Sequence, residues 1–253
     1  MATVLHSSFK VIAHRGNSSQ APENTYASFL QAIELNVDYI ECDVQLTKDL
    51  IPVIMHDPTT HGILPNNEVL NISALNWEDL RKLDAGSWYD KRFSGQRILS
   101  LEEFLLNPRG KVGAMIEIKD DTFKEKWMAK IVAEQMQRLS LHSEQYGPII
   151  LGSLNPTLIN WLQEDLPDQD FIAIVDQMED LGKFLQTRSK YFGLRYALAT
   201  RELIQFLRNK SKEVWTWTVD DAEIAKKLVE DGVQGIISNQ PKKMQLLQKS
   251  MHK

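Results

Sequence analysis

The sequence predicts an α/β protein, a TIM (β/α)8 barrel of parallel strands with a small inserted subdomain over the active-site face. Three observations favour this fold. Short apolar runs alternate with longer amphipathic segments about eight times along the 253 residues. Several runs are nearly continuous in valine, isoleucine and aromatic residues, as strands buried on both faces are. No GxGxxG or GxxxxGK[ST] motif is present, which disfavours the alternative, a doubly wound open sheet.

Each apolar run is interpreted as a strand, and each longer segment with apolar residues at helical spacing as a helix. The predicted strands are Val11–His14, Tyr39–Gln45, Val53–His56, Ala114–Lys119, Ile149–Gly152, Phe171–Val175, Tyr191–Leu194, Val214–Val219 and Gly235–Ser238. The predicted helices are Glu23–Leu35, Leu101–Leu106, Phe123–Leu139, Pro156–Glu164, Met178–Thr187, Thr200–Asn209, Asp221–Glu230 and Pro241–Gln248. Pro22 and Glu23 favour the start of the first helix, because proline suits the first turn and an acid complements the helix dipole.

The stretch 58–98 interrupts this alternation. It is polar and rich in turn residues, with one short helical piece near Trp77–Leu83. A loop of this length is unusual between a strand and a helix, so we interpret it as an insertion over one face of the barrel. No linker or low-complexity segment divides the chain, which predicts a single domain over residues 1–253.

Composition excludes several classes of function. The net charge of −5 gives no basic surface for nucleic acid and does not favour an anionic membrane. A phosphate-bearing substrate would need local positive charge from side chains or a metal. The single cysteine, Cys42, allows no internal disulfide, and no apolar run is long enough for stable membrane insertion. We expect a soluble, cytoplasmic protein.

The predicted strand Tyr39–Gln45 carries two acids on one face. Residues two apart in a strand point to the same side, so Glu41 and Asp43 lie together, while Cys42 faces the helices. Two poorly solvated carboxylates remain charged only beside a compensating cation, and a divalent metal is the simplest one. The alternative is an exposed edge strand with two solvated acids.

A second predicted strand repeats this arrangement with Glu117 and Lys119 on one face. If that face is the barrel interior, Glu117 is a third carboxylate for the same metal, and Lys119 is a fixed positive charge beside it. Carboxylates without thiolates suit one hard divalent cation, Mg²⁺ or Ca²⁺. The alternative is an ion pair without any metal, either Glu117–Lys119 or a pair between neighbouring strands.

Two histidines, His14 and His56, end predicted strands, and the carboxyl ends of barrel strands carry active sites. Histidine titrates near neutral pH, so the pair could act as acid and base on opposite sides of a bond. Near the C-terminus, Trp215 and Trp217 share one strand face. Trp217 could form an apolar wall of the substrate pocket, with core packing as the alternative.

These residues fall within a set of ordered motifs that covers nearly the whole chain. The motifs are His14-Arg15-Gly16, Ala21-Pro22-Glu23-Asn24-Thr25, Glu41-Cys42-Asp43-Val44-Gln45-Leu46-Thr47-Lys48-Asp49, Pro52-Val53-Ile54-Met55-His56-Asp57, Glu117-Ile118-Lys119 and Trp217-Thr218-Val219. The insertion adds Leu83-Asp84-Ala85-Gly86-Ser87-Trp88, followed by Leu101-Glu102-Glu103. In their order and spacing the motifs resemble those of the glycerophosphodiester phosphodiesterases.

The resemblance implies metal-dependent hydrolysis of a small glycerophosphodiester to sn-glycerol 3-phosphate and an alcohol. It implies that Glu41, Asp43 and Glu117 bind the metal. It further implies that His14 and His56 are the acid–base pair, and that Arg15 and Lys119 contact phosphate. A lysophospholipid-directed phosphodiesterase on the same scaffold is the alternative activity, and a catalytically silent phosphate-ester binder is a third hypothesis.

Three positions depart from the family pattern. Leu50 stands where glycine commonly follows Lys-Asp, so its turn must avoid a positive φ or accept strain. The segment after Asp57 lacks an arginine that the family often carries. Ser238-Asn239-Gln240-Pro241 replaces the more usual Thr-Asp-x-Pro. No assembly signal is specific to this chain, which leaves a homodimer open.

Overall fold

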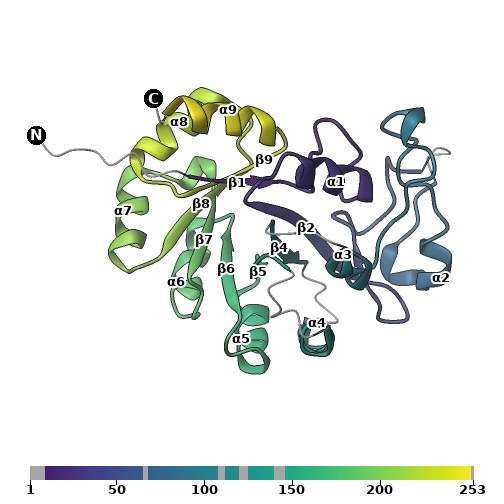
Figure 1. Ribbon diagram of the computed structural model, residues 1–253. Helices are drawn as coiled ribbons and strands as arrows, with labels where there is room; N and C mark the ends of the chain where they lie inside the picture. Colours follow the sequence, from purple (N-terminus) through teal and green to yellow (C-terminus); the bar gives the residue numbers. More distant parts are fainter. Residues whose placement is uncertain (1–8, 65–67, 108–111, 120–124, 140–145, 252–253) are drawn as a thin grey trace, which may run out of the picture.

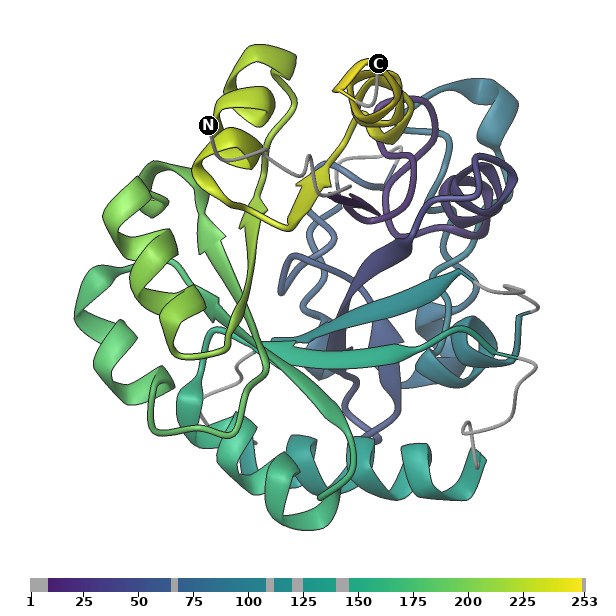
Figure 2. The same cartoon turned by 60° about the vertical axis from the view of Figure 1, so that its left-hand side comes forward.

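The computed structural model describes residues 9–64, 68–107, 112–119, 125–139 and 146–251. Its centre is a closed barrel of parallel strands surrounded by helices (Figures 1 and 2). The barrel strands are β1 (Lys10–Ala13), β2 (Tyr39–Leu46), β4 (Gly113–Ile118), β5 (Ile149–Ser153), β6 (Asp170–Val175), β7 (Tyr191–Arg195), β8 (Glu213–Trp217) and β9 (Gly235–Ser238). Parallel pairing of β1 with both β2 and β9 closes the ring. The predicted barrel is thus confirmed.

Helices between the strands cover the outside of the barrel. They are α1 (Tyr26–Glu34), α3 (Leu101–Leu106), α4 (Glu125–Leu139), α5 (Pro156–Asp165), η3 (Met178–Asp180), α6 (Leu181–Phe184), η4 (Tyr196–Leu198), α7 (Arg201–Asn209), α8 (Ala222–Asp231) and α9 (Pro241–Met251). The main core lies between strands and helices, and it includes Cys42 and Val44 from the outward face of β2. The predicted start of α4 at Phe123 lies outside the described residues.

The inward faces of the strands fill the barrel with a second core. Its buried members include Ile12, Tyr39, Met115, Ile172 and Trp215. The rings of Tyr39 and Trp215 pack with their centroids 5.2 Å apart. The aromatic rings fill the lumen below the carboxyl ends of the strands, where the inward-facing polar residues lie.

One predicted strand does not belong to the barrel. β3 (Pro52–Ile54) pairs antiparallel with the end of β2 and lies outside the ring. The prediction of a further strand equivalent to the others was therefore wrong at this position. The turn between β2 and β3 is too short for the crossover that a parallel pair needs, whereas it suits an antiparallel pair.

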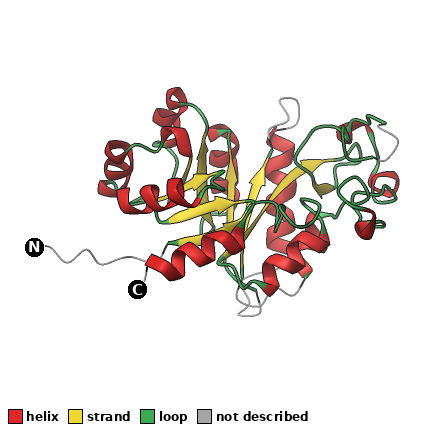
Figure 3. Ribbon diagram, turned by 90° about the horizontal axis from the view of Figure 1, so that it is seen from above, coloured by secondary structure: helices red, strands yellow, loops and turns green. Residues whose placement is uncertain are grey.

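The chain after β3 forms the predicted insertion, which is rich in loops and lies to one side of the barrel (Figure 3). It contains the short helices η1 (Ile72–Ala74), α2 (Trp77–Leu80) and η2 (Lys91–Phe93). A small core of its own packs Ile72, Leu80 and Ile98 against β3. The insertion thus packs on β3, and hydrogen bonds also join it to Lys48 after β2 and to Ala27 of α1.

Leu50 in the β2–β3 turn has a φ of 64°, so the turn accepts strain where the family commonly has glycine. Thr47 holds the turn together: its hydroxyl donates to Asp49 Oδ1 at 2.7 Å and accepts from the Ile51 backbone N–H at 2.9 Å. Among the described residues, we find no helix with the length and apolar character required to cross a bilayer.

Candidate active site

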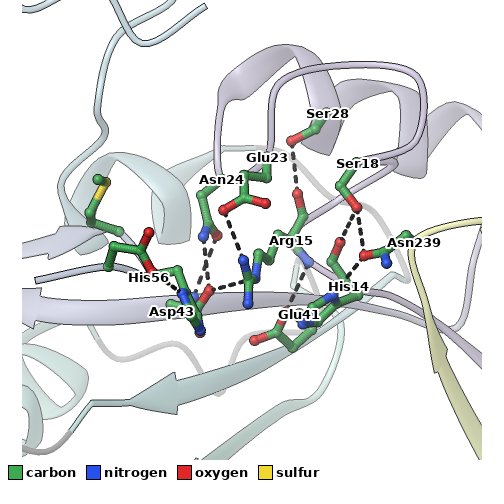
Figure 4. A network of polar contacts seen from close by, with 12 residues as sticks. His14, Arg15, Ser18, Glu23, Asn24, Ser28, Glu41, Asp43, His56 and Asn239 are labelled. Atoms are coloured by element: carbon green, nitrogen blue, oxygen red, sulfur yellow. Dashed lines mark hydrogen bonds and ion pairs between the residues drawn. The ribbon is translucent and has the colours of Figure 1, made fainter. Parts of the chain in front are cut away.

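Five inward-facing residues meet at the mouth of the barrel because of strand alternation. Tyr39 and Met115 lie in the inner core, so Glu41 and Asp43 on β2, and Glu117 and Lys119 on and after β4, face inward as well. His14 follows β1 on the same face as the buried Ile12. Figure 4 shows the part of this cluster around Glu41 and Asp43.

The three acids lie close together, as predicted. One carboxylate oxygen from each of Glu41, Asp43 and Glu117 lies within 4.8 Å of the other two. Lys119 Nζ is 2.8 Å from Asp43 Oδ1 and 2.5 Å from Glu117 Oε1. The alternative of an exposed edge strand is wrong, because Glu41 and Asp43 are buried. The ion-pair alternative describes part of the arrangement, because Lys119 pairs with Glu117 and, across the strands, with Asp43.

Burial is the main influence on the acids of this cluster. It raises the pKa of Glu41 well above its usual value, and the charges of Asp43 and Glu117 add to the effect. Burial also raises the pKa of Glu117, against the opposing charge of Lys119. For Asp43, burial alone would raise the pKa, but the charges of Lys119 and Arg15 lower it to about 2. Two of the three acids therefore lack sufficient positive charge in the protein itself.

A divalent cation fits this donor set. Glu41 Oε2 accepts a hydrogen bond from the Arg15 backbone N–H at 2.8 Å. Glu41 Oε1 is buried and has no hydrogen-bond partner among the described residues. A buried carboxylate oxygen without a partner is costly, and a bound cation would compensate it. Oxygen donors from three carboxylates are those that Mg²⁺ and Ca²⁺ prefer.

Arg15 lies between two acids. Its Nη1 donates to Glu23 Oε1 at 2.9 Å, and its Nε is 3.2 Å from Asp43 Oδ2. Burial alone would lower the pKa of Arg15, but the charges of Asp43 and Glu23 raise it. Arg15 therefore carries its charge at the barrel mouth, beside Asp43.

The predicted start of the first helix was wrong by three residues. α1 begins at Tyr26 with Thr25 as its N-cap. Glu23 pairs with Arg15, and Asn24, at a φ of 56°, donates from Nδ2 to Asp43 Oδ2 at 2.9 Å. Tertiary contacts with the acid cluster thus hold these residues outside the helix that their sequence favours.

His14 is enclosed by the barrel. Its Nδ1 lies 2.7 Å from Asn239 Oδ1, and its Nε2 lies 4.0 Å from Glu41 Oε2. Burial, together with the charge of Arg15, lowers the pKa of His14 from 6.5 to about 4, although Asp43 opposes the change. His14 is therefore neutral at pH 7 and able to accept a proton.

His56 reaches the site by a different route from His14. It follows β3, outside the barrel, so the expectation that both histidines end equivalent strands was wrong. Antiparallel pairing nevertheless returns the chain toward Asp43, whose backbone oxygen accepts from Met55 N–H at 2.9 Å. Figure 4 shows His56 on the Asp43 side of the cluster and His14 on the Glu41 side.

Two residues orient His56. Asp57 Oδ1 lies 2.6 Å from His56 Nδ1. The side-chain amide of Gln45, on β2, lies within hydrogen-bond distance of the backbone oxygens of Met55, His56 and Asp57, at 3.0, 2.8 and 2.7 Å. The amide thus ties the segment after β3 to the end of β2.

Two tryptophans lie near the site. Trp217, at the end of β8, is half-buried on the inner core, and its indole N–H donates to Gly193 O at 2.9 Å. It thus combines core packing with a place at the mouth. Trp88 of the insertion lines a small pocket together with His56, Asp57 and Asn24.

Sequence reasoning gave no role in the site to Asn239, Asp57, Glu23 or Gln45. For Asn239 a signal existed, because it stands where the family usually has an acid. For Asp57, adjacency to His56 was the only signal. Contacts between residues far apart in the chain, such as Asn239 with His14, have no local sequence signature.

The geometry can be set beside known proteins. Residues 14–243 match the model of the glycerophosphoryl diester phosphodiesterase family. A Caldanaerobacter subterraneus protein named glycerophosphodiester phosphodiesterase is 31% identical over 252 residues, covering 91% of this chain and 94% of that protein. A Bacillus subtilis protein of the same name is 27% identical over 258 residues, covering 91% and 83%.

A solved structure gives the same result. The structure of an Oleispira antarctica phosphodiesterase in complex with the product sn-glycerol-3-phosphate superposes with a TM-score of 0.86 at 26% identity. The superposition covers 94% of this chain and 96% of that one. Together with the family match over almost the entire barrel, these likenesses establish that the chain belongs to the glycerophosphoryl diester phosphodiesterase family.

Proposed function

We propose that the protein hydrolyses glycerophosphodiesters to sn-glycerol 3-phosphate and an alcohol, with a divalent cation as cofactor. The observation that carries the proposal is the buried cluster of Glu41, Asp43 and Glu117, flanked by His14 and His56. The related Oleispira antarctica phosphodiesterase, which binds sn-glycerol-3-phosphate as its product, supports the substrate class.

Glu41, Asp43 and Glu117 would hold one Mg²⁺ or Ca²⁺. When bound, the cation neutralises charge on the phosphodiester and so favours attack at phosphorus. Lys119 keeps its proton there, because Asp43 and Glu117 raise its pKa although burial opposes them. As a point charge beside the carboxylates, Lys119 would contact a phosphoryl oxygen.

Arg15 would provide the second phosphate contact. Its contacts with Glu23 and Asp43 use Nη1 and Nε, and the guanidinium has five N–H donors in all. Donors beyond those two can reach a phosphoryl oxygen while Glu23 holds the fork in place. Planar guanidinium groups suit phosphate because two parallel hydrogen bonds can form.

His14 and His56 would act on opposite sides of phosphorus. One histidine accepts the proton of the attacking hydroxyl group, and the other donates a proton to the leaving alkoxide, so no free alkoxide forms. The same two transfers serve attack by water or by the glycerol 2-hydroxyl. Trp217 would supply an apolar wall of the substrate pocket.

Two further assignments stay predictions: a single domain over residues 1–253 and a cytoplasmic location. A homodimer stays open. The lysophospholipid alternative is not favoured, because the relatives are named for glycerophosphodiesters. Comparing turnover of glycerophosphocholine and lysophosphatidylcholine tests the preference directly. Faster turnover of the lysophospholipid would contradict the proposal.

The central experiment is a coupled assay for sn-glycerol 3-phosphate released from glycerophosphocholine. We expect activity with Mg²⁺ or Ca²⁺, loss of it with a strong chelator, and recovery on adding the metal back. His56→Ala should lower kcat about 10²–10⁴-fold. His61→Ala, which removes an exposed histidine of the neighbouring insertion, outside the cluster, is the matched control. Full activity in the chelator would contradict the metal assignment.

Cation binding can also be measured without turnover. Glu41→Gln should abolish the rise in melting temperature that Mg²⁺ or Ca²⁺ gives to the wild-type protein, because binding only to the folded state stabilises it. In the absence of metal, Glu41→Gln should stabilise the protein, because it removes a buried charge next to Asp43. An unchanged cation response would contradict the ligand assignment.

A further inference from the structure

A chain of hydrogen bonds leads from His14 to a residue that does not contact it. His14 Nδ1 lies 2.7 Å from Asn239 Oδ1, and Asn239 Nδ2 donates to Asp220 Oδ2 at 2.8 Å. Asn239 follows β9, and Asp220 lies in the loop after β8. Figure 4 shows Asn239 beside His14, on the side away from Asp43.

Each link of this chain has a fixed donor and acceptor. An ionised Asp220 only accepts hydrogen bonds, so the NH₂ group of Asn239 must face it. The amide oxygen of Asn239 must then face His14. An amide oxygen also only accepts, so the proton of neutral His14 lies on Nδ1, and Nε2 is left bare toward Glu41.

Asp220 is itself held in one orientation. Its Oδ1 accepts from the Asn239 backbone N–H and from Ser238 Oγ, both at 2.8 Å. The Asn239 backbone is fixed in turn, because its carbonyl accepts from Ser19 N–H at 3.1 Å. Only Oδ2 of Asp220 is therefore left for the side-chain amide of Asn239.

We propose that Asp220 and Asn239 are positioning residues that set the tautomer of His14, with Asp220 deciding which way the Asn239 amide faces. The kinetic part of this inference rests on the proposed function, in which protons pass through Nε2 of His14. The tautomer itself exists without substrate. An asparagine can thus serve where the family usually has an acid, because Asp220 fixes its orientation.

Asp220→Asn gives the most specific prediction. The new amide keeps its oxygen on the Asn239 N–H and Ser238 Oγ, so its NH₂ group meets the NH₂ group of Asn239. Two donors cannot bond, and rotation of the Asn239 amide by half a turn relieves the conflict. Its NH₂ group then faces His14 Nδ1, which must accept, and the histidine proton moves to Nε2.

The double variant Asp220→Asn/Asn239→Asp should reverse this change. The new carboxylate at position 239 accepts from His14 Nδ1–H on one side and from the new amide at position 220 on the other. Donor and acceptor match again at both links, and the negative charge lies at position 239 instead of position 220. The single variant Asn239→Leu removes the acceptor and should leave His14 without a fixed tautomer.

The experiment measures imidazole ¹⁵N chemical shifts at one pH in protein labelled at histidine, with the His14 signals assigned from His14→Gln. We expect Nδ1 protonated in the wild type and in the double variant, and Nε2 protonated in Asp220→Asn. Asp221→Asn is the matched control. It removes the same charge one residue away, at the N-cap of α8, and should leave His14 unchanged.

Turnover of glycerophosphocholine is measured in parallel. We expect Asp220→Asn to lower kcat by about 10²-fold with a much smaller change in KM, because proton transfer contributes in the transition state. The double variant should recover most of the loss. Release of no sn-glycerol 3-phosphate by the wild type would remove the proposed function but would leave the tautomer result valid.

Nδ1 still protonated in a folded Asp220→Asn protein would overturn the proposal. If Asp220→Asn does not fold, Asn239→Leu decides: His14 wholly protonated on Nδ1 in that variant would also overturn it. A loss of kcat in Asp220→Asn that the double variant does not recover, with the tautomer unchanged throughout, would assign Asp220 a purely structural role.

Discussion

The two histidines of the site lie on different parts of the molecule: His14 on the barrel, and His56 next to the insertion with its separate small core. His14 follows β1, between the inner and main cores, and 16% of its side chain is exposed. His56 follows β3, beside the small core of the insertion, and 34% of its side chain is exposed. A partly buried amide, Asn239, orients the first, and an exposed carboxylate, Asp57, orients the second.

The two sides of the site therefore differ in the surroundings that they give to polar and charged side chains. The barrel side concentrates buried charge, which needs rigid, well-packed surroundings to be tolerated. The insertion side bears His56, whose side chain is more exposed to solvent than that of His14.

Chemical rescue should separate the two histidines most strongly. His14→Ala and His56→Ala should each lower kcat about 10²–10⁴-fold. Added imidazole should restore more activity to His56→Ala, because that position opens to solvent. The measurement is kcat at fixed pH with increasing imidazole. Equal rescue of both variants would mean that the exposure of the two sites does not differ in solution.

Core substitutions should destabilise the barrel and the insertion separately. Leu207→Ala in the main core should lower the free energy of unfolding by about 2–5 kcal/mol. Leu80→Ala, equally buried but in the insertion core, should instead open the insertion locally, with a smaller change in melting temperature. Hydrogen exchange over residues 68–98 and thermal denaturation measure the two effects. A fall in melting temperature as large as that of Leu207→Ala, without faster local exchange, would refute the separation.

The burial of His14 should appear in the pH dependence of stability. Its pKa is about 4 in the folded protein and 6.5 when exposed, so between these values the unfolded state binds more protons. The free energy of unfolding should therefore rise with pH from about 4 to 6.5, by roughly 3 kcal/mol from His14 alone. Denaturant unfolding in a chelating buffer measures it, and His14→Gln should lose this contribution. The same slope in both proteins would contradict the burial of His14.

A substitution in the β2–β3 turn, which joins the barrel strand β2 to β3, should change the unfolding free energy least. Leu50→Gly relieves a positive φ of 64° but adds freedom to the unfolded chain. We expect a net gain of about 0.5–1 kcal/mol in unfolding free energy, with unchanged kcat. Lys48→Gly, at a neighbouring position without positive φ, is the control and should destabilise. A loss of stability in Leu50→Gly would show that packing of the leucine outweighs its strain.

Sequence predicted the barrel well because its strands have a strong, repeated pattern of apolar residues. It also brought Glu41, Asp43 and Glu117 together, since strand alternation fixes which side chains face inward. The direction of β3 was not predicted, because an apolar run does not reveal whether it pairs parallel or antiparallel. The start of α1 was missed because Glu23 and Asn24 bind residues of the site instead of continuing a helix.

Trp215 and Tyr39 seal the barrel below the site, and this has a consequence for the order of events in a reaction cycle. Under the proposed function, the fragments of the diester would therefore leave by the mouth through which the diester enters. Accumulated product would then compete with substrate for the same site, which inhibition of the initial rate by added sn-glycerol 3-phosphate would test.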